Sequence, residues 1–359
     1  MKNKKWLLGV AVFSLFFLAA CQQEPEIAQQ PILEGRIAEP YRRTLYPMDT
    51  VVTLQIFNEG KDAVLDKAVE HLLYLEEILN VNESSLTEAS EVARINDNAG
   101  IQPVEVSEGT FFLIQTALDF SRQTAGVFNA AIGPLTSLWN IGFEDARRPE
   151  DWEIQSALTR LDYEAITLDE NNLTVFLHEP GMRLDLGGIA KGYMADELTR
   201  IFIENDVDSG IINIGGDIFL LGTNARGNEW RVGISDPFDP RSAVPAISFL
   251  VENRSVVTSG VYERYFEYEG VKYHHILDSS TGFPFKNDVA GITIVAENAI
   301  AGEKYTTLAF GLGIEAGLEA IEEVDGVEAI FITFQREIYH TSGLQGQLRV
   351  EADDFTIID

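Results

Sequence analysis

Arg183-Leu184-Asp185-Leu186-Gly187-Gly188-Ile189-Ala190-Lys191-Gly192-Tyr193 joins a short apolar strand pattern to the start of an expected helix. The strand pattern ends at an acid, two glycines follow, and a lysine stands in the first helical turn. Glycine permits the positive φ angles and the close backbone approach that such a junction needs. A helix N-terminus offers free N–H groups and a partial positive charge to a phosphate. The stretch therefore predicts a site for a phosphorylated, polar ligand, with an ordinary glycine-rich connection as the alternative.

Outward from this junction, helical and strand patterns are mixed without a regular βαβ repeat, which predicts an α+β fold. No linker rich in Pro, Gly or Ser interrupts the chain after residue 40, so we expect one elaborated domain or two intimate ones over 41–359. Helices are expected at 63–79, 109–125, 190–205, 299–312 and 315–324, and strands at 50–57, 173–177, 211–214, 218–221, 230–234, 246–251, 255–258, 262–268, 271–275, 289–296 and 329–333.

The N-terminus indicates export. Three lysines precede an apolar run and then small residues, which is the pattern of a signal peptide at 1–20. The segment Leu18-Ala19-Ala20-Cys21 resembles a bacterial lipobox, in which the cysteine is lipidated and begins the mature protein. We expect a lipid anchor on Cys21 at the extracytoplasmic face of the cell membrane and a flexible tether at 21–40. An uncleaved anchor is the alternative.

Cysteine count and charge exclude several classes of protein. Cys21 is the only cysteine, so an intrachain disulfide, a CxxC pair and a cysteine-rich metal site are excluded. The formal net charge is −31, and removal of residues 1–20 would take away three lysines and no acid, giving −34. Such a charge repels nucleic acid and anionic lipid, and neither is expected as a partner. A ligand that bears phosphate then needs a local positive site, either a metal ion or clustered Lys and Arg.

Further clusters carry residue types suited to binding or catalysis. Asn213-Ile214-Gly215-Gly216-Asp217 places an acid beside paired glycines, and 258–264 places hydroxyls before a strand pattern. His274-His275-Ile276-Leu277-Asp278-Ser279-Ser280-Thr281-Gly282-Phe283-Pro284 sets two histidines before a hydroxyl-rich loop, and histidine acts as base or ligand near neutral pH. Glu303 and Thr307 lie four residues apart on one face of an expected helix and offer oxygen atoms suited to Mg²⁺.

Each cluster also has a purely structural interpretation. A tight β turn, a packing histidine or a hydroxyl bonded back along its own helix would account for it. The sequence contains no HExxH, GxSxG or P-loop motif, which excludes zinc proteases of that type, α/β-hydrolases and Walker NTPases. Gly311-Leu312-Gly313-Ile314-Glu315-Ala316-Gly317 resembles a dinucleotide fingerprint but follows a helix, so we expect a turn between two helices.

Taken together and in chain order, the clusters resemble the ApbE family, the FAD:protein FMN transferases. The resemblance extends over almost the whole expected mature chain. It implies a T-fold-like α+β architecture with largely antiparallel sheets and flanking helices. The matching segments are 48–50, 90–96, 126–139, 185–193, 213–217, 258–264, 275–284 and 303–311.

The resemblance also implies roles for individual residues. Metal binding would fall to Glu303, Thr307 and the backbone of Gly188. His275 is the expected catalytic base or orienting group, and Asp185 is its rival. The expected FAD contacts are Met48, Val127, Phe128, Asn129, Asp185, Lys191 and Leu277.

The sequence departs from the family pattern at three places. Asn129 stands where many members have aspartate, and Glu303 stands where most have aspartate. No proline follows Asp278, although one is common there in the family. Because glutamate is one methylene longer than aspartate, the resemblance leaves the metal preference open.

The reaction implied by the resemblance is Mg²⁺-dependent transfer of FMN from FAD to a Thr or Ser hydroxyl of an acceptor protein, with release of AMP. The family's acceptors are extracytoplasmic flavoproteins of membrane electron-transfer systems, so an acceptor with an FMN-binding domain is the expected partner. A metal-dependent FAD pyrophosphatase that gives FMN and AMP is one alternative, and a non-catalytic flavin-binding lipoprotein is another. A flavin oxidoreductase is disfavoured because no nicotinamide-binding fingerprint accompanies the site.

Overall fold

The computed structural model describes residues 30–47, 50–81 and 89–358. Within it, Ile32–Asp359 form one compact unit. The expected signal peptide, Cys21 and the FAD contact predicted at Met48 lie outside the described residues. None of the helices in the described ranges has both the length and the apolar character that a membrane span requires.

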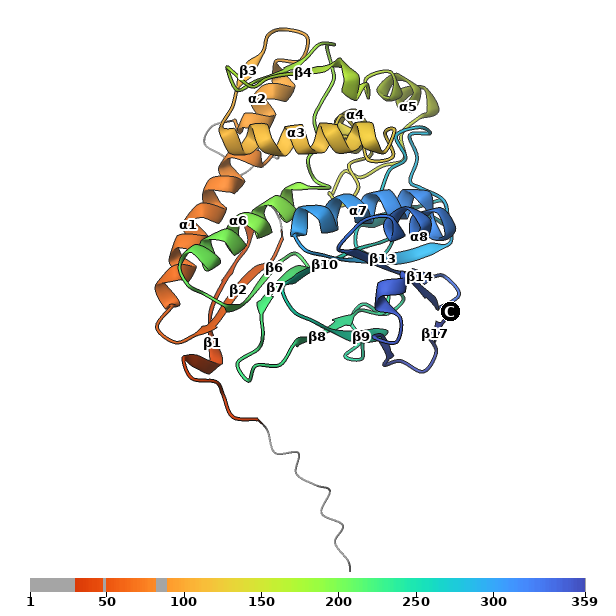
Figure 1. Cartoon of the computed structure of the whole chain (residues 1–359). Helices are drawn as coiled ribbons and strands as arrows, with labels where there is room; N and C mark the ends of the chain where they lie inside the picture. Colours follow the sequence, from red (N-terminus) through yellow and green to blue (C-terminus); the bar gives the residue numbers. More distant parts are fainter. Residues whose placement is uncertain (1–29, 48–49, 82–88, 359) are drawn as a thin grey trace, which may run out of the picture. The chain divides into compact units, whose positions relative to one another are not determined.

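A nine-stranded sheet is the largest element of this unit (Figure 1). Neighbouring strands run antiparallel, except for the last pair, β15 and β17, which is parallel. With the helices described next, this confirms the predicted α+β fold with largely antiparallel sheets. The order along the sheet is β1 (Arg36–Leu45), β2 (Val52–Asn58), β6 (Ser209–Ile214), β7 (Asp217–Gly222), β10 (Arg254–Gly260), β13 (Val289–Ala296), β14 (Val327–Thr333), β15 (Glu337–His340) and β17 (Thr356–Ile357).

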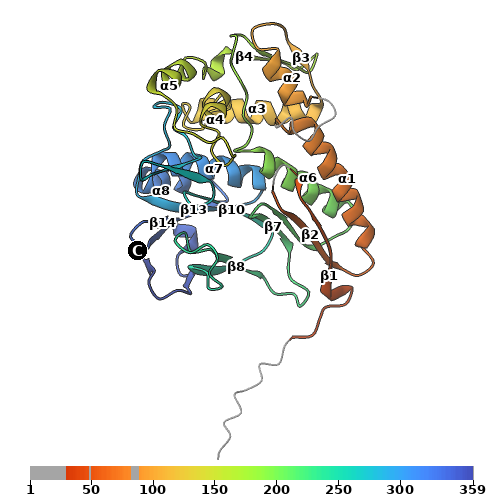
Figure 2. The ribbon, with the colours of Figure 1, turned by 180° about the vertical axis from the view of Figure 1, so that it is seen from behind.

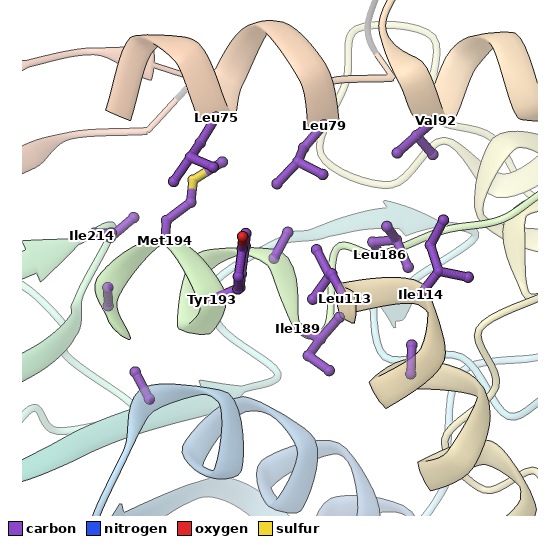
Figure 3. Packing of buried hydrophobic residues seen from close by; sticks show 14 of the residues in the cluster. Leu75, Leu79, Val92, Leu113, Ile114, Leu186, Ile189, Tyr193, Met194 and Ile214 are labelled. Carbon is purple, nitrogen blue, oxygen red and sulfur yellow. The ribbon is translucent and has the colours of Figure 1, made fainter. Parts of the chain in front are cut away.

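Long helices cover one face of the sheet (Figures 1 and 2). Their apolar residues recur at three- and four-residue spacing, as they do from Leu65 through Leu72 to Leu79, so one stripe of each helix is buried. Figure 3 shows Leu79 in one buried cluster with Leu113 and Met194, which come from other helices. The helices are α1 (Asp62–Leu79), α6 (Ala190–Glu204), α7 (Ala299–Leu312) and α8 (Ile314–Glu322).

A small three-stranded sheet, in the order β16 (Arg349–Val350), β9 (Ile247–Val251) and β8 (Trp230–Ile234), covers the opposite face. Side chains along a strand alternate between the two faces of a sheet. Accordingly, Phe219 of β7 packs under the helices, whereas its neighbour Leu220 packs with the small sheet. Because both faces are covered, β13 is buried at every residue.

A further helical layer lies beyond α6 and α7 (Figure 1). Its shorter helices were not expected, because seven or eight residues make only about two turns and show little periodicity. Local groups set their ends: Ser90 Oγ accepts a hydrogen bond from Ala93 N, and Pro134 stands in the first turn of α4. The layer contains α2 (Glu91–Asp97), β3 (Val104–Glu105), α3 (Glu108–Gln123), α4 (Gly133–Trp139), α5 (Asp151–Leu158), the 3-10 turn η3 (Tyr163–Ala165), β4 (Ile166–Asp169) and β5 (Thr174–Leu177), and a second 3-10 turn, η4 (Ser342–Leu344), follows β15.

A two-stranded hairpin of β11 (Tyr265–Tyr268) and β12 (Val271–His274) packs against α4. Phe266 and Tyr273 lie opposite each other in the hairpin, and their rings stack. Both rings also contact the indole of Trp139, which is fully buried. These aromatic contacts attach the hairpin to the helical layer.

One segment with a strand pattern forms no strand in the structure, and one expected strand begins later than predicted. Residues 183–186 run without a partner strand, because the amide of Asn96 bonds both Leu184 N at 2.6 Å and Leu184 O at 3.1 Å. A side chain therefore satisfies the backbone there. Residues 262–264 form a turn, and β11 begins only at Tyr265, so the strand expected at 262–268 starts three residues later than predicted.

The start of β1 and the end of α7 bear on two boundaries that the sequence predicts. Strand β1 begins at Arg36, within the predicted tether 21–40, because Arg36 already pairs with Asn58 of β2. The regular structure therefore starts earlier than composition predicted. Gly313 separates α7 from α8 with φ of +77°, a conformation that favours glycine, and this confirms the predicted turn between two helices.

Gly192→Ala is expected to lower the free energy of unfolding by about 1–3 kcal/mol, although alanine favours helix more than glycine does. A Cβ at this position of α6 would lie 2.5 Å from Ala299 O, at the start of α7. Urea unfolding measures the change. Ile203→Ala is the control, because this side chain of α6 is 57% exposed and its loss should change stability by no more than about 0.5 kcal/mol. Equal losses would contradict the close approach of α6 and α7.

Candidate active site

A cavity of about 790 Å³ lies where the sequence clusters meet. Its wall combines the junction before α6, the β6–β7 turn, the end of β10, the segment after β12, and α7. The volume falls within the range of about 300–1,000 Å³ typical of small-molecule sites. Every predicted site residue that the structure describes lines this cavity: Val127, Phe128, Asn129, Asp185, Gly188, Lys191, His275, Leu277, Glu303 and Thr307.

The glycine junction brings backbone to the cavity wall. Asp185 Oδ1 accepts a hydrogen bond from Gly187 N at 2.8 Å, which holds the turn that precedes α6. A Cβ on Gly188 would lie 3.3 Å from the ring of Phe128 and 3.5 Å from Thr307 Oγ1, so this backbone runs close beside α7. No side chain caps the start of α6. The junction therefore presents backbone and a helix N-terminus to a ligand in the cavity.

Lys191 lies between two buried carboxylates. Its Nζ pairs with Asp217 and lies 3.1 Å from Glu303 Oε1. Asp217 and Glu303 are each 4% exposed. Burial opposes the charge of Lys191, yet the two carboxylates outweigh burial and hold the pKa of Lys191 above its usual range.

The balance of charge in this group is negative. With both carboxylates ionised, one ammonium faces two negative charges, and one of these is left over at the cavity wall. Burial, with a contribution from Asp217, raises the pKa of Glu303, and Lys191 only partly offsets this effect. Glu303 Oε1 receives no hydrogen bond of acceptable geometry, although Lys191 Nζ is near. A cation beside Glu303 would satisfy both the spare charge and the unpartnered oxygen.

The hydroxyl groups of two adjacent threonines of α7 differ in their hydrogen bonds. This difference distinguishes a hydroxyl bonded back along its own helix from one that can bind a metal or ligand. The Thr306 hydroxyl donates to Glu303 O at 2.8 Å, which is the back-bonded arrangement. Both threonines line the cavity, but the Thr307 hydroxyl makes no hydrogen bond with the described residues. Thr307 is therefore the hydroxyl that remains available to a ligand.

The donor set around Glu303 fits Mg²⁺. A carboxylate, a hydroxyl and nearby backbone oxygens are hard ligands, and Mg²⁺ keeps several waters or phosphate oxygens in its remaining positions. Across 30–47, 50–81 and 89–358, no group of three His, Cys, Asp or Glu side chains could hold a metal ion alone. A metal bound here would therefore depend on Thr307, the backbone near Gly188 and oxygens of the substrate.

His275 presents one unpartnered nitrogen to the cavity. Its Nδ1 lies 3.3 Å from Arg264 O, and because a carbonyl only accepts, Nδ1 carries the hydrogen. That leaves Nε2 as an acceptor, with no hydrogen bond from the described residues. Burial, helped by the charge of Arg264, lowers the pKa of His275 to about 3. The ring is therefore neutral near pH 7 and able to accept a hydrogen bond.

The neighbouring His274 has a structural role. Its Nε2 donates to Phe285 O at 2.9 Å, and its Nδ1 accepts from Ile276 N at 3.3 Å. Its ring is buried edge-on against Phe310. Both nitrogens are occupied, so His274 holds the segment that carries His275.

Asn129 is also committed to backbone. Its Nδ2 donates to Leu161 O at 3.0 Å, and its Oδ1 accepts from Ala131 N at 2.8 Å. These bonds hold the turn that brings Val127 and Phe128 to the cavity. Both partners of the Asn129 amide are neutral backbone groups, a carbonyl and an N–H. The amide can therefore make these bonds without the charge of the aspartate that is common in the family.

Two residues of the candidate site, Asp217 and Glu263, were not predicted individually as site residues. Asp217 follows the Gly215-Gly216 turn, whose φ angles are +64° and +103°, and this turn aims Asp217 at Lys191. The signal was an acid beside paired glycines, but its partner could not be identified from spacing. Glu263 lines the cavity.

The chain matches known proteins over most of its length. A family model described as the ApbE family matches residues 48–331, a range that contains the whole cavity wall. An FAD:protein FMN transferase of Klebsiella pneumoniae (strain 342) is 38% identical over 295 residues, covering 82% of this chain and 90% of the relative. A protein of the same description from Treponema pallidum (strain Nichols) is 33% identical over 358 residues, covering 96% of each.

Solved structures share the fold. The crystal structure of the ApbE protein from Thermotoga maritima gives a TM-score of 0.77 at 28% identity and covers 88% of this chain and 100% of its own. The flavin transferase ApbE from Vibrio cholerae gives a TM-score of 0.74 at 24% identity, covering 86% of this chain and 98% of its own. At that identity the second likeness concerns the fold alone.

Proposed function

The chain belongs to the ApbE family and is an FAD:protein FMN transferase, and we propose that it moves FMN from FAD to a threonine or serine hydroxyl of an extracytoplasmic acceptor. Mg²⁺ is the proposed cofactor, and AMP is the second product. The proposal rests above all on the cavity, where oxygen ligands, a lysine and a neutral histidine face one space. That combination suits a pyrophosphate substrate and a hydroxyl nucleophile.

FAD binding would use the junction before α6. Backbone at Gly187 and Gly188 and the ammonium of Lys191 line the wall on which a pyrophosphate can lie. Mg²⁺, when held by Glu303, Thr307 and backbone near Gly188, would offset phosphate charge and polarise the bond that breaks. These groups supply locally the positive charge that a protein of net charge −31 otherwise lacks.

The reaction is a substitution at the phosphorus of the FMN half of FAD. The acceptor oxygen forms a bond to this phosphorus, and the bond from the phosphorus to the bridging oxygen breaks, so that AMP leaves. The hydroxyl proton passes to His275 Nε2, the unpartnered acceptor at the cavity wall. Because the lowered pKa of this ring disfavours its protonated form, the proton goes on directly to solvent. The products are a phosphoester-linked FMN on the acceptor and free AMP.

His275 suits the role of base better than Asp185 does. One oxygen of Asp185 is engaged by Gly187 N, and this bond holds the turn. His275 Nδ1 is fixed by Arg264 O, which orients the ring and leaves Nε2 open. We therefore assign Asp185 to positioning the junction and contacting FAD.

We also propose that a lipid on Cys21 anchors the enzyme at the extracytoplasmic face of the cell membrane. The support is the lipobox-like Leu18–Cys21 segment and the preceding charged and apolar run. Such an anchor would place the enzyme beside flavoproteins of membrane electron-transfer systems, which are the proposed acceptors. Palmitate labelling of the wild-type chain and of Cys21→Ser checks this, and equal labelling would contradict it.

FAD turnover with and without an acceptor distinguishes the transferase from its alternatives. The purified protein is incubated with FAD and Mg²⁺, and AMP and free FMN are separated by chromatography. We expect AMP to form faster when a flavoprotein with an FMN-binding domain is added, with little free FMN. Equal release of AMP and free FMN, unaffected by the acceptor, would favour the pyrophosphatase. FAD that stays intact and bound would favour a binding lipoprotein.

Thr307→Val is expected to reduce transfer by about 10–100-fold at limiting Mg²⁺, because it removes a metal-facing hydroxyl and keeps the side-chain shape. Thr306→Val is the matched control on the same helix turn. Its hydroxyl bonds Glu303 O and not a ligand, so its loss should leave transfer nearly unchanged. Initial rates across a Mg²⁺ series give the comparison. Equal losses in the two variants would contradict the assignment of Thr307.

A further inference from the structure

A second cavity, of about 900 Å³, lies against the segment that carries His275. Val127 lines both cavities. Along the segment between them, His275 and Leu277 line the first cavity, whereas His274 and Asp278 line the second. The wall that separates the two spaces is therefore a single stretch of chain.

This wall is held from both sides. Ser279 Oγ donates to Gly126 O at 2.7 Å, which ties the loop after Asp278 to the turn that carries Val127. On the other side, Phe285 N donates to Ile276 O at 3.1 Å. A ligand in the second cavity would thus lie against a fixed wall, one residue away from the proposed base.

The second cavity carries positive charge in a strongly acidic chain. Lys286 is exposed and forms neither an ion pair nor a hydrogen bond with the described residues. Lys272 lies 3.9 Å from Glu267, a weak exposed contact, and its Nζ is above the ring of Tyr265. The one acid lining the cavity, Asp278, accepts hydrogen bonds from Ser280 N, Ser280 Oγ and Thr281 Oγ1 and forms no ion pair with either lysine. Two lysines against one carboxylate leave the lining with a positive balance, which suits an acidic partner.

The cavity also borders an open strand edge. In the described residues β12 has β11 as its one partner strand. Beyond His274, residues 283–285 cover the other edge of this segment. The contacts are the hydrogen bonds of the Phe285 backbone with His274 and Ile276 and the bridge between Leu277 and Pro284. At Val271–Tyr273, which line the second cavity, that edge has no partner strand. An extended segment of another protein can add to such an edge.

The groups suited to FAD all line the first cavity. Glu303, Thr307 and Lys191 are absent from the lining of the second. We propose that the second cavity docks the acceptor protein, as an extended segment with an acidic residue close to the hydroxyl that receives FMN. The acidic residue pairs with Lys272 and Lys286, and the segment continues past the edge of the wall at Val127, which lines both cavities, to bring the hydroxyl to His275. This inference rests on the proposed transferase function and names how that site selects its partner.

Charge reversal tests the docking site. With an acceptor that the wild-type enzyme modifies, we expect Lys272→Glu/Lys286→Glu to lower kcat/KM for the acceptor by at least about tenfold, because like charges then face each other. The dissociation constant for FAD, measured by flavin fluorescence, should change less than twofold. Lys67→Glu is the control, since Lys67 is exposed on α1 and lines neither cavity.

A compensating change distinguishes docking from damage to the fold. Replacing the acidic residue nearest the modified hydroxyl of the acceptor by lysine should weaken transfer by the wild-type enzyme and restore it with the doubly reversed variant. Unchanged kcat/KM in the variant would overturn the proposal. A higher dissociation constant for FAD, with kcat/KM for the acceptor unchanged, would also overturn the proposal and would assign the second cavity to FAD. If the wild-type enzyme modifies no acceptor at all, the transferase function itself is wrong.

Discussion

Glu303→Gln is expected to lower FMN transfer by at least about a hundredfold and to leave the protein folded. The amide keeps the shape of the side chain but removes its charge and one acceptor oxygen, at the position where Glu303 Oε1 has no hydrogen bond. Lys191 still has Asp217 as a partner, so no buried ammonium is left unpaired. Initial transfer rates across a Mg²⁺ series, together with the urea unfolding midpoint, measure the two effects separately.

Glu303→Asp is the matched variant for this prediction. It restores the charge with one methylene fewer, as in most members of the resembled family. We expect a large part of the activity to return, with a shifted Mg²⁺ dependence, because the carboxylate is drawn back toward α7. Full activity in Glu303→Gln would contradict the metal assignment and leave Glu303 as a structural partner of Lys191.

His275→Gln is expected to lower transfer by about 10²–10⁴-fold, the usual contribution of a positioned general base. Glutamine can fill the space and accept a hydrogen bond, but it cannot take up the proton of the attacking hydroxyl. His274→Gln on the other side of the same segment should act through stability, because both nitrogens of His274 bond backbone. Transfer rates at saturating FAD, corrected for the folded fraction, give the comparison, and an equal loss in both variants would contradict the assignment.

The pH dependence of stability tests the environment of His275 independently of activity. Burial lowers its pKa to about 3 in the folded chain, whereas an exposed histidine in the unfolded chain titrates near 6.5. Its contribution to stability is therefore complete above about pH 6.5 and is lost as the pH falls toward about 3. The free energy of unfolding should fall less steeply between pH 6.5 and 4 in His275→Gln than in the wild type. Parallel curves would show that His275 is not buried in the neutral form.

Much of the fold follows from local pattern. The periodic helices and most strands were predictable, since long stretches of 3.6- and two-residue spacing leave little choice. The predictions were wrong where one contact between residues distant in sequence, rather than a repeating pattern, determines the local structure. Residues 183–186 have strand composition, yet the side chain of Asn96 takes the place of a neighbouring strand. The order of strands in the sheet depends on pairings far apart in sequence, which local spacing does not contain.

The site was predictable as a set of residues and not as a set of contacts. The predicted residues in the described ranges line one cavity, and their roles there stay predictions. The sharing of Lys191 between Asp217 and Glu303 was not predictable, because three elements distant in sequence meet there. The bond from the Thr306 hydroxyl to Glu303 O was not predicted either, whereas the four-residue spacing from Glu303 had already singled out Thr307.

The mass of an acceptor protein tests the central claim most directly. The enzyme is mixed with FAD, Mg²⁺ and a flavoprotein that has an FMN-binding domain, and the intact acceptor is weighed by mass spectrometry. The account predicts a gain of one FMN on a threonine or serine, an equal amount of AMP, and loss of both with EDTA or with Glu303→Gln. An acceptor of unchanged mass beside AMP and free FMN, across several such flavoproteins, would contradict transfer and assign the cavity to hydrolysis of FAD.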